Sequence, residues 1–308
     1  MTDQLASMSL IGVYSAMAVY TLAFLVYTLD LSRRSAKTPV PVAVGAATTT
    51  VHEKAQPAST ATVYQRVATA LLVVGWLIHL GSTILRGVAG SRVPWANMFE
   101  FGLTATMLIV AVFMGTLLWK DLGYIGAFVS GFVLLALGVV TVNYYVDVVP
   151  LPPALQSAWL VIHVFVASLA TAFFALGAGL SVYQLIRSKM DRSNIALPRL
   201  MASLPDAPTL ESIAYRLYVV GFVLWTFTLI AGAIWAERAW GRYWGWDVKE
   251  VWTFIIWVLF AGYIHARATR GWRGERAAWL GLVGFGAVIF NYAIVNVFFT
   301  GLHSYSGL

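Results

Sequence analysis

The sequence contains no cysteine among its 308 residues. That absence excludes disulfides, thiolate metal sites and any thiol relay carried by this chain. Charged residues are also scarce, at 11% of the chain, whereas 60% of the residues are hydrophobic. A soluble domain cannot bury so large an apolar fraction. The composition therefore predicts an all-α protein that crosses a membrane several times.

Two familiar motifs are missing as well. The sequence has no glycine-rich phosphate-binding loop, so a transport ATPase is not indicated. Its N-terminus lacks the basic region and small-residue cleavage site of a signal peptide, so we expect the first apolar run to be kept as an anchor. The formal net charge is +7, but the basic residues lie between apolar runs, where they act as topology signals. We therefore expect no nucleic-acid partner.

Eight apolar runs are long enough to cross a bilayer as helices at ~1.5 Å per residue. These runs are Ser7–Leu29, Thr62–Leu85, Met98–Trp119, Tyr124–Val142, Trp159–Leu185, Ile213–Trp235, Val251–Ala268 and Ala278–Phe299. Residues 1–34 are predicted to hold the first membrane helix, and residues 62–308 a seven-helix membrane domain. Residues 35–61 are rich in Ala, Thr, Val and Pro without an amphipathic period, so they predict a flexible cytoplasmic linker. His52 in this linker is expected to be an ordinary solvated histidine.

The distribution of Lys and Arg predicts the orientation in the membrane. Fifteen of the twenty basic residues lie in or beside the odd-numbered connections, and the other five are Arg86, Arg92, Arg238, Arg242 and Lys249. Basic connections stay in the cytoplasm. Both termini, and the connection between the sixth and seventh runs, are therefore expected on the periplasmic or lumenal side.

That connection is predicted as an outer loop over residues 235–252 and reads WAERAWGRYWGWDVKEVW; we call it the tryptophan segment. Its tryptophans are Trp235, Trp240, Trp244, Trp246 and Trp252, and its charged residues include Arg238, Arg242, Asp247, Lys249 and Glu250. An aromatic belt at the bilayer interface is one interpretation, but a belt needs only about one or two indoles per helix end. Flat π-faces, indole N–H donors and fixed cations together favour a large, flat, anionic aromatic ligand such as haem.

Two further features lie on the same side of the membrane. Glu100 stands just inside the third run, where it either complements the helix dipole, or pairs with an arginine or helps to shape a ligand cleft. The segment NYYVDVVPLPPALQS, residues 143–157, is rich in proline and aromatic residues. It is a candidate lid over the tryptophan segment.

Four histidines lie in or beside membrane helices, where they are costly enough to need a reason. His163, near the start of the fifth run, and His303, after the eighth, flank the tryptophan segment on its side of the membrane. They are candidate axial ligands of one haem iron, although each could instead hydrogen-bond a backbone carbonyl. His265 lies roughly 20 Å toward the cytoplasm, so it requires a second site. His79 does not match it in depth and is interpreted as a packed or hydrogen-bonded helix histidine. The ligand opposite His265 would then come from another polypeptide.

Four stretches together resemble the CcsA/ResC-type membrane subunit of the System II cytochrome c synthase. They are SAWLVIHV, WGRYWGWDVKEVW, YIHARATRGWRG and GLHSYSGL, and the likeness covers roughly the last two thirds of the chain. One departure is Val248, which stands where the family motif usually has a proline. This alters the local turn but removes no ligand.

The resemblance implies a haem-handling function in cytochrome c biogenesis. His163 and His303 would be axial ligands of a haem b held under the tryptophan segment, and His265 would ligate a transmembrane haem together with a CcsB/ResB-type partner. The complex would act as a holocytochrome c synthase on apocytochrome c, with thioredoxin-like thiol reductants as further partners. The location implied is a bacterial plasma membrane or a thylakoid membrane.

Within that interpretation the tryptophans stack on the macrocycle, and Arg238, Arg242 or Lys249 are candidates to neutralise haem propionates. Since the chain has no cysteine, we expect no covalent nucleophile in it, and its contribution is positioning and redox control. Three rivals stay open: a System I-like haem exporter subunit, a b-type electron-transfer cytochrome, and an assembly scaffold without a cofactor.

Overall fold

A computed structural model describes residues 1–37, 61–151, 153–192 and 204–303. The described residues form helices and no strand. The main helices are α1 (Thr2–Lys37), α2 (Val63–Gly90), α3 (Met98–Trp119), α4 (Gly126–Asn143), α5 (Ala158–Arg192), α7 (Ala207–Trp240), α8 (Val248–Thr269) and α9 (Glu275–Ile289). Helix α9 continues through a π-helix, η3 (Phe290–Val295), into α10 (Asn296–Phe298), and two short 3-10 helices are η1 (Gly123–Ile125) and η2 (Pro153–Leu155). The predicted linker, with His52, lies almost entirely outside the described residues.

The eight predicted membrane spans are confirmed. Each corresponds to a helix, or to α9 with its continuation, that is long and apolar enough to cross a bilayer, and the protein is an integral membrane protein. Several helices are longer than predicted: α5 has 35 residues and α7 has 34. At ~1.5 Å per residue each spans roughly 50 Å, more than a hydrocarbon core of ~30 Å.

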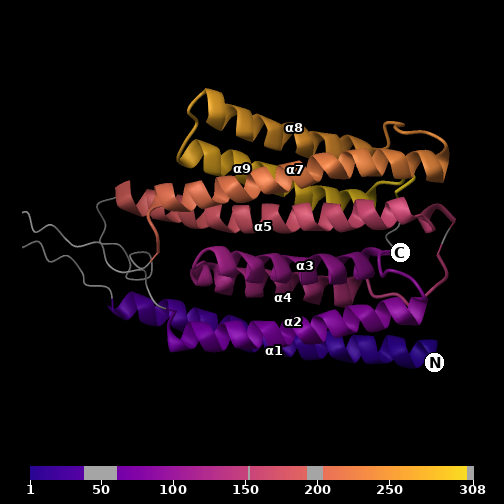
Figure 1. Ribbon diagram of the computed structural model, residues 1–308, viewed down its shortest axis with the longest axis horizontal. Helices are drawn as coiled ribbons and strands as arrows, with labels where there is room; N and C mark the ends of the chain where they lie inside the picture. The colour runs from indigo at the N-terminus through magenta and orange to yellow at the C-terminus, as the bar shows by residue number, and fades with distance from the viewer. Residues whose placement is uncertain (38–60, 152, 193–203, 304–308) are drawn as a thin grey trace, which may run out of the picture.

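The helices run nearly parallel or antiparallel along one long axis (Figure 1). Helices α1 and α2 pack together at one edge of the bundle, α3 and α4 lie in the middle, and α5 follows with α7, α8 and α9 beyond it. We call the end that holds the α7–α8 connection the tryptophan end. It also holds the α2–α3 and α4–α5 connections, and the α3–α4 and α8–α9 connections lie at the opposite end.

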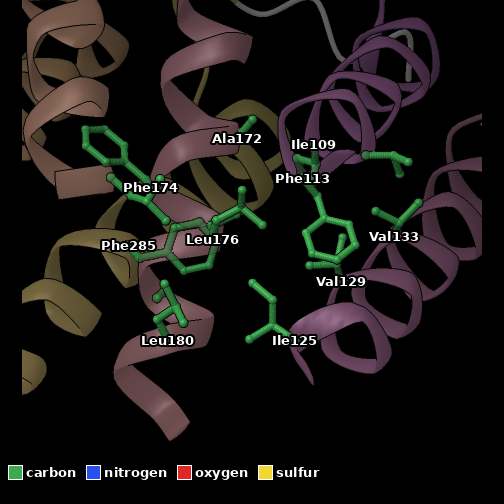
Figure 2. Close-up of a cluster of buried hydrophobic side chains, with 14 of the residues drawn as sticks. Ile109, Phe113, Ile125, Val129, Val133, Ala172, Phe174, Leu176, Leu180 and Phe285 are labelled. Carbon is green, nitrogen blue, oxygen red and sulfur yellow. The ribbon is translucent and has the colours of Figure 1, made fainter. Parts of the chain in front are cut away.

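Helix α5 joins the two halves of the bundle through an apolar core. Figure 2 shows Ile109 and Phe113 of α3 with Val129 and Val133 of α4, facing Leu176 and Leu180 of α5 and Phe285 of α9. These side chains are buried. Because lipid is as apolar as the core, van der Waals packing holds the helices together more than hydrophobic transfer does.

Close helix approach is visible beside this core, where the rings of Phe174 on α5 and Phe260 on α8 stack with centroids 3.8 Å apart. A Cβ atom at Gly221 of α7 would lie 2.6 Å from the Phe174 ring. Only glycine therefore allows α7 to pack against α5 at this level, and that packing fixes the position of the half of α7 that leads to the tryptophan end.

The tryptophan segment is less of a loop than the sequence suggests. Residues 235–240 form the last turns of α7, and residues 248–252 form the first turn of α8, so the connection is only 241–247. Gly241 ends α7 in the left-handed conformation, with φ of 70°, which glycine adopts without strain. Asp247 begins α8 as its N-cap. The prediction of a loop over the whole of 235–252 was therefore wrong.

Candidate functional site

One large cavity opens at the tryptophan end. It encloses about 1080 Å³ of empty space, counting its open mouth. Its walls come from the start of α3, the halves of α5 and α7 nearest the tryptophan end, the start of α8, the π-helix and the turn that follows α10. The lining includes Trp95, Asn97, Met98, Phe101, His163, Trp225, Trp235, Trp244, Lys249, Asn291, Tyr292, Asn296 and His303. Both predicted axial ligands therefore face the same cavity.

His163 reaches the cavity from the second turn of α5. Its Nδ1 atom lies 3.0 Å from the Thr228 carbonyl oxygen on α7. Since a carbonyl only accepts, Nδ1 carries the proton and Nε2 keeps its lone pair. A Cβ atom at Gly232 would lie 2.7 Å from the imidazole ring, so glycine at this position makes room for the ring. The hydrogen bond to a carbonyl, which was the alternative to ligation, is thus present and compatible with ligation through Nε2.

His303 reaches the cavity from the turn after α10. Its Nδ1 atom donates to Asp247 Oδ1 at 3.0 Å, which again leaves Nε2 free of the proton when the ring is neutral. The hydrogen bond from His303 is the main cause that lowers the pKa of the Asp247 carboxyl to about 2, against the opposing effect of burial. A carboxylate that holds one ring nitrogen of a histidine is a common support for a metal-ligating imidazole.

Asp247 joins the start of α8 to the turn that carries His303. Its side chain caps α8 through the Lys249 N–H at 3.0 Å, and its second oxygen accepts from the Leu302 N–H at 2.9 Å. Glu250 completes a capping box: its Oε2 accepts from the Asp247 N–H at 3.0 Å and from the Gly245 N–H at 2.8 Å. The start of α8, the 241–247 connection and the His303 turn are therefore fixed to one another.

Two tryptophans of the segment pack around the imidazoles. The Trp235 ring lies nearly parallel to His163, with centroids 5.9 Å apart, and edge-on to His303 at 5.5 Å. Trp240 is edge-on to His303 at 4.8 Å. The indole of Trp235 thus packs against both histidines. Leu155 of η2 packs with Trp235 in a small buried cluster, so part of the 143–157 segment covers this region, as expected for a lid.

The other three tryptophans differ in position. Trp244 lines the cavity. Trp246 is 75% exposed and adopts a positive φ of 61°, a conformation that is strained for a bulky residue. Trp252 packs against Phe290 with centroids 4.3 Å apart and is absent from the cavity lining. Trp235 and Trp240 therefore lie beside the imidazoles, and Trp244 lines the cavity. Trp246 faces outward, and Trp252 packs outside the cavity lining.

The predicted basic residues also separate. Lys249 lines the cavity, and its Nζ donates to the Asn291 carbonyl at 2.8 Å and to Asn296 Oδ1 at 2.5 Å. Arg242 pairs with Glu250 at 3.1 Å and supports the connection. Arg238 is exposed and lies outside the cavity lining. Lys249 is thus the predicted cation that the fold brings into the cavity.

Sequence reasoning missed the side chains that the π-helix contributes. Asn291, Tyr292 and the following Asn296 all line the cavity, and π-helices are frequent at functional sites. The Tyr292 ring stacks on Phe101 of α3 with centroids 4.6 Å apart. Two asparagines within an apolar run were a usable signal, because polar side chains in membrane helices need a reason.

Glu100 pairs with arginines, which was one of its two interpretations. It is fully buried and accepts from Arg86 Nε at 3.0 Å and from both terminal nitrogens of Arg92, at 2.5 and 3.1 Å. Arg86 Nη2 also donates to the Val146 carbonyl at 2.6 Å. This buried cluster ties the start of α3 to α2 and to the 143–157 segment, and so fixes one wall of the cavity.

The remaining two histidines lie away from the cavity. His265 is exposed on α8, toward the opposite end of the bundle. His79 is fully buried, and its Nδ1 atom lies 3.3 Å from the Tyr20 hydroxyl of α1. The interpretation of His79 as a packed helix histidine is confirmed.

The donor set of the cavity fits an iron porphyrin. Two imidazoles hold their Nδ1 atoms in hydrogen bonds, which leaves Nε2 of each for a metal, and aromatic rings line the space between the walls. Bis-histidine ligation is an established mode of haem binding.

Comparisons with known proteins identify the family of the chain. The family model described as "Cytochrome C assembly protein" matches residues 10–303. The chain is 36% identical to the cytochrome c biogenesis protein CcsA of Guillardia theta over 262 residues, which cover 75% of this chain and 86% of that protein. It is 34% identical to CcsA of Synechococcus elongatus over 291 residues, covering 78% of this chain and 87% of the relative.

A solved structure supports the fold. The chain superposes on "Cytochrome c Heme Lyase CcmF" with a TM-score of 0.64 at 17% identity, covering 94% of this chain and 46% of that one. At this identity the likeness concerns the fold alone, and the chain spans less than half of that protein. The sequence matches carry the assignment: the chain belongs to the cytochrome c assembly protein family and is of the CcsA type.

Proposed function

We propose that this chain binds haem b between His163 and His303 and positions it for attachment to the CxxCH motif of apocytochrome c. The observation that carries the proposal is the shared cavity. It holds two imidazoles whose Nδ1 atoms are hydrogen-bonded, and aromatic side chains line it. Family membership places the chain in cytochrome c biogenesis. Haem is then a substrate, held until it is passed on to the apocytochrome.

The chain contributes positioning because it has no cysteine of its own. The apocytochrome thiols add across the vinyl double bonds of haem: each sulfur bonds to the carbon nearer the ring and the thiol hydrogen goes to the terminal carbon, without net oxidation. His163 and His303 hold the iron until the histidine of CxxCH replaces one of them. Trp235, Trp240 and Asp247 keep both imidazoles oriented, and Trp244 and Lys249 contact the porphyrin from the cavity wall.

A membrane partner of the CcsB/ResB type completes the synthase in this proposal. His265 is exposed on the same stripe of α8 as the exposed residues Phe254 and Val258, spaced as on one helix face. An imidazole on a lipid-facing surface is unfavourable unless another chain covers it. We place there a second haem whose other ligand belongs to the partner. The tryptophan end then faces the periplasm or the lumen, following the basic residues of the sequence.

Spectra of the purified chain and a maturation assay test the proposal. We expect His163→Ala and His303→Ala each to abolish cytochrome c maturation and the bis-histidine spectrum, and added imidazole to restore part of both by filling the vacant ligand position. His79→Gln serves as the matched control, because this histidine is buried outside the cavity. Normal maturation in either single alanine variant would refute the axial pair.

The partner site has its own test. We expect the isolated chain to hold at most the outer haem, and co-expression with the partner to add a second haem that His265→Ala removes. Haem stoichiometry and the reduced-minus-oxidised spectrum measure both. Two fully ligated haems in the isolated chain, one of them lost in His79→Ala, would contradict the assignment of His265 to a shared site.

A further inference from the structure

The cavity has a polar wall that the axial ligands do not explain. Within the part of the chain that the structure describes, Nε1 of Trp95, Nδ2 of Asn97 and both side-chain polar atoms of Asn291 are buried without a hydrogen-bond partner. All three residues line the cavity. Asn291 is 0% exposed and Asn97 is 5% exposed. Burying unpaired amides is unfavourable, so these groups are arranged for something that enters the cavity.

The three residues belong to one wall, although they come from two parts of the sequence. The start of α3 and the π-helix touch through the stacked rings of Phe101 and Tyr292. They also touch where Asn296 Nδ2 lies 3.1 Å from Met98 Sδ. Trp95 and Asn97 precede α3, and Asn291 is the second residue of the π-helix. We call Trp95, Asn97 and Asn291 the polar wall.

The orientation of the Asn97 amide is fixed by local structure. Its Oδ1 caps α3 by accepting from the Glu100 N–H at 2.9 Å. Exchanging the two amide positions would break this cap, so Nδ2 is the atom that stays free to donate. The buried Arg86–Glu100–Arg92 cluster holds the same turn in place. Asn97 therefore presents a pre-oriented N–H donor to the cavity.

The Lys249 side chain lies next to Asn291. Lys249 Nζ donates to the Asn291 carbonyl at 2.8 Å and lies 4.7 Å from the centroid of the Tyr292 ring. Lys249 itself lines the cavity. The wall thus combines N–H donors from Trp95, Asn97 and Asn291 with a nearby ammonium group, and Asn291 Oδ1 is the one acceptor among the unpartnered atoms. Donors that outnumber acceptors, beside a cation, suit an ionised carboxylate, which only accepts.

We propose that the polar wall binds a propionate carboxylate of haem. This inference rests on the proposed function, because it concerns the orientation of the same ligand. A porphyrin held only by two imidazoles is free to rotate about the axis through the iron. A propionate held at the polar wall fixes that rotation. Because the vinyl groups lie across the macrocycle from the propionates, the wall also determines which edge is offered to the apocytochrome thiols.

Porphyrin discrimination by the purified full-length chain tests the proposal. The probes are haemin, haemin dimethyl ester, in which both carboxylates are masked, and iron mesoporphyrin, which keeps the carboxylates but lacks vinyl groups. We expect the wild type to bind haemin ~10-fold more tightly than the ester, as for charge-assisted hydrogen bonds. It should bind iron mesoporphyrin as tightly as haemin. Soret titrations give the affinities, and the spectrum reports whether ligation is bis-histidine.

Two variants of the wall sharpen the test. Asn97→Asp keeps the helix cap but replaces the N–H donor with a carboxylate oxygen that repels a propionate. Asn291→Leu removes the amide at similar volume. In both, the preference for haemin over the ester should fall to about one, with the bis-histidine spectrum intact. Asn143→Leu is the matched control, because Asn143 is exposed at the end of α4 and bonds only its own helix; the preference should be unchanged.

The outcomes separate the two proposals. A wild type that binds both porphyrins equally, or wall variants that keep the full preference, would overturn the propionate site while leaving bis-histidine binding intact. A wild type that gives no bis-histidine spectrum with any probe would overturn the proposed function and this inference together.

Discussion

The two ends of the bundle use buried polar groups in opposite ways. At the opposite end, the charged groups are paired within the chain: Glu211 accepts from Arg267 Nε at 3.1 Å and from the Gly274 N–H at 2.7 Å, and Gln65 donates to Asp121 at 2.7 Å. The Tyr124 hydroxyl is the exception among the described residues of this end, since it is buried without a partner. At the tryptophan end, Trp95, Asn97 and Asn291 hold polar atoms toward a cavity without partners in the described chain.

This difference separates polar groups that hold the fold from polar groups that serve a ligand. A closed pair stabilises helix ends and needs nothing further. An open group is a cost to the fold that a bound molecule offsets. Among the charged residues of the tryptophan end, both Glu100 carboxylate oxygens are bonded to arginines, whereas the Lys249 side chain lines the cavity.

The largest effect is expected from crowding His163. Gly232→Val would push the imidazole away from its place against α7, and we expect haem affinity to fall ~10- to 100-fold, as when the support of a metal ligand is lost. Gly286→Val is the control, because a Cβ atom there meets no atom within 4 Å. Soret titration of both variants measures the effect. Equal affinities would show that the position of His163 does not depend on this contact.

Breaking the closed pair at the opposite end should affect stability and leave the ligand site alone. Glu211→Ala leaves the Arg267 guanidinium without its carboxylate, and we expect a loss of about 3 kcal/mol in the free energy of unfolding. Denaturant unfolding in detergent measures it, and the haem affinity of the folded fraction should equal that of the wild type. A large loss of haem affinity would mean that the two ends are coupled and that polar groups of the opposite end also serve the ligand site.

Asp247 both holds the fold, as the N-cap of α8, and supports His303 at the ligand site. Its replacement should therefore have a smaller, pH-dependent effect on stability. The Asp247 pKa is lowered from 3.8 to about 2 by the hydrogen bond from His303. A carboxyl whose pKa is lower in the folded than in the unfolded state stabilises the fold at pH values above its unfolded pKa. That contribution is lost as the pH falls through the folded pKa. Asp247→Asn keeps an N-cap residue but loses the charge.

We therefore expect the wild type to have a higher unfolding temperature than Asp247→Asn above about pH 4. The difference should narrow as the pH falls toward 2. Thermal unfolding of the haem-free protein across this range is the measurement. A difference that stays constant down to pH 2 would show that the Asp247 charge contributes nothing through its pKa.

The smallest effects are expected within the tryptophan segment itself. Trp244→Ala should weaken haem binding about 5-fold through lost stacking, because Trp244 lines the cavity. Trp246→Ala should change it less than ~2-fold, because Trp246 is 75% exposed and does not line it. If Trp246→Ala lowered maturation while haem binding stayed normal, Trp246 would act on the apocytochrome. A larger loss of haem affinity in Trp246→Ala than in Trp244→Ala would contradict the assignment of Trp244, rather than Trp246, to haem binding.

Hydrophobic length and the types of polar residue were enough to predict all eight spans and to expect His163 and His303 on one side, and both line the same cavity. They could not predict the extent of the connection, because residues such as Trp240 and Lys249 are compatible with either a loop or a helix end. Arg242 was predicted as a cation for propionates, but it pairs with Glu250, eight positions later. That pairing depends on how sharply the 241–247 connection turns.

The contribution of Asn291 was harder still to foresee. In a regular α-helix its direction would follow from helical periodicity, whereas the π-helix alters the register of the residues after it. Similarly, Glu100 was recognised as a functional or dipole residue, but its two arginine partners lie on α2 and on the α2–α3 connection. Contacts of this kind depend on tertiary packing rather than on local pattern.

The two histidines differ in how the chain holds them. His163 lies within a helix of 35 residues, so withdrawing it requires α5 to move or its side chain to leave Gly232 and Thr228. His303 lies in a turn after the last helix, held chiefly by Asp247. Turns outside helices open locally on faster timescales than helix interiors. We expect amide exchange at Leu302 to be much faster than at His163. With the axial pair proposed above, the iron would lose His303 first, and the incoming histidine would arrive from the side of the turn after α10.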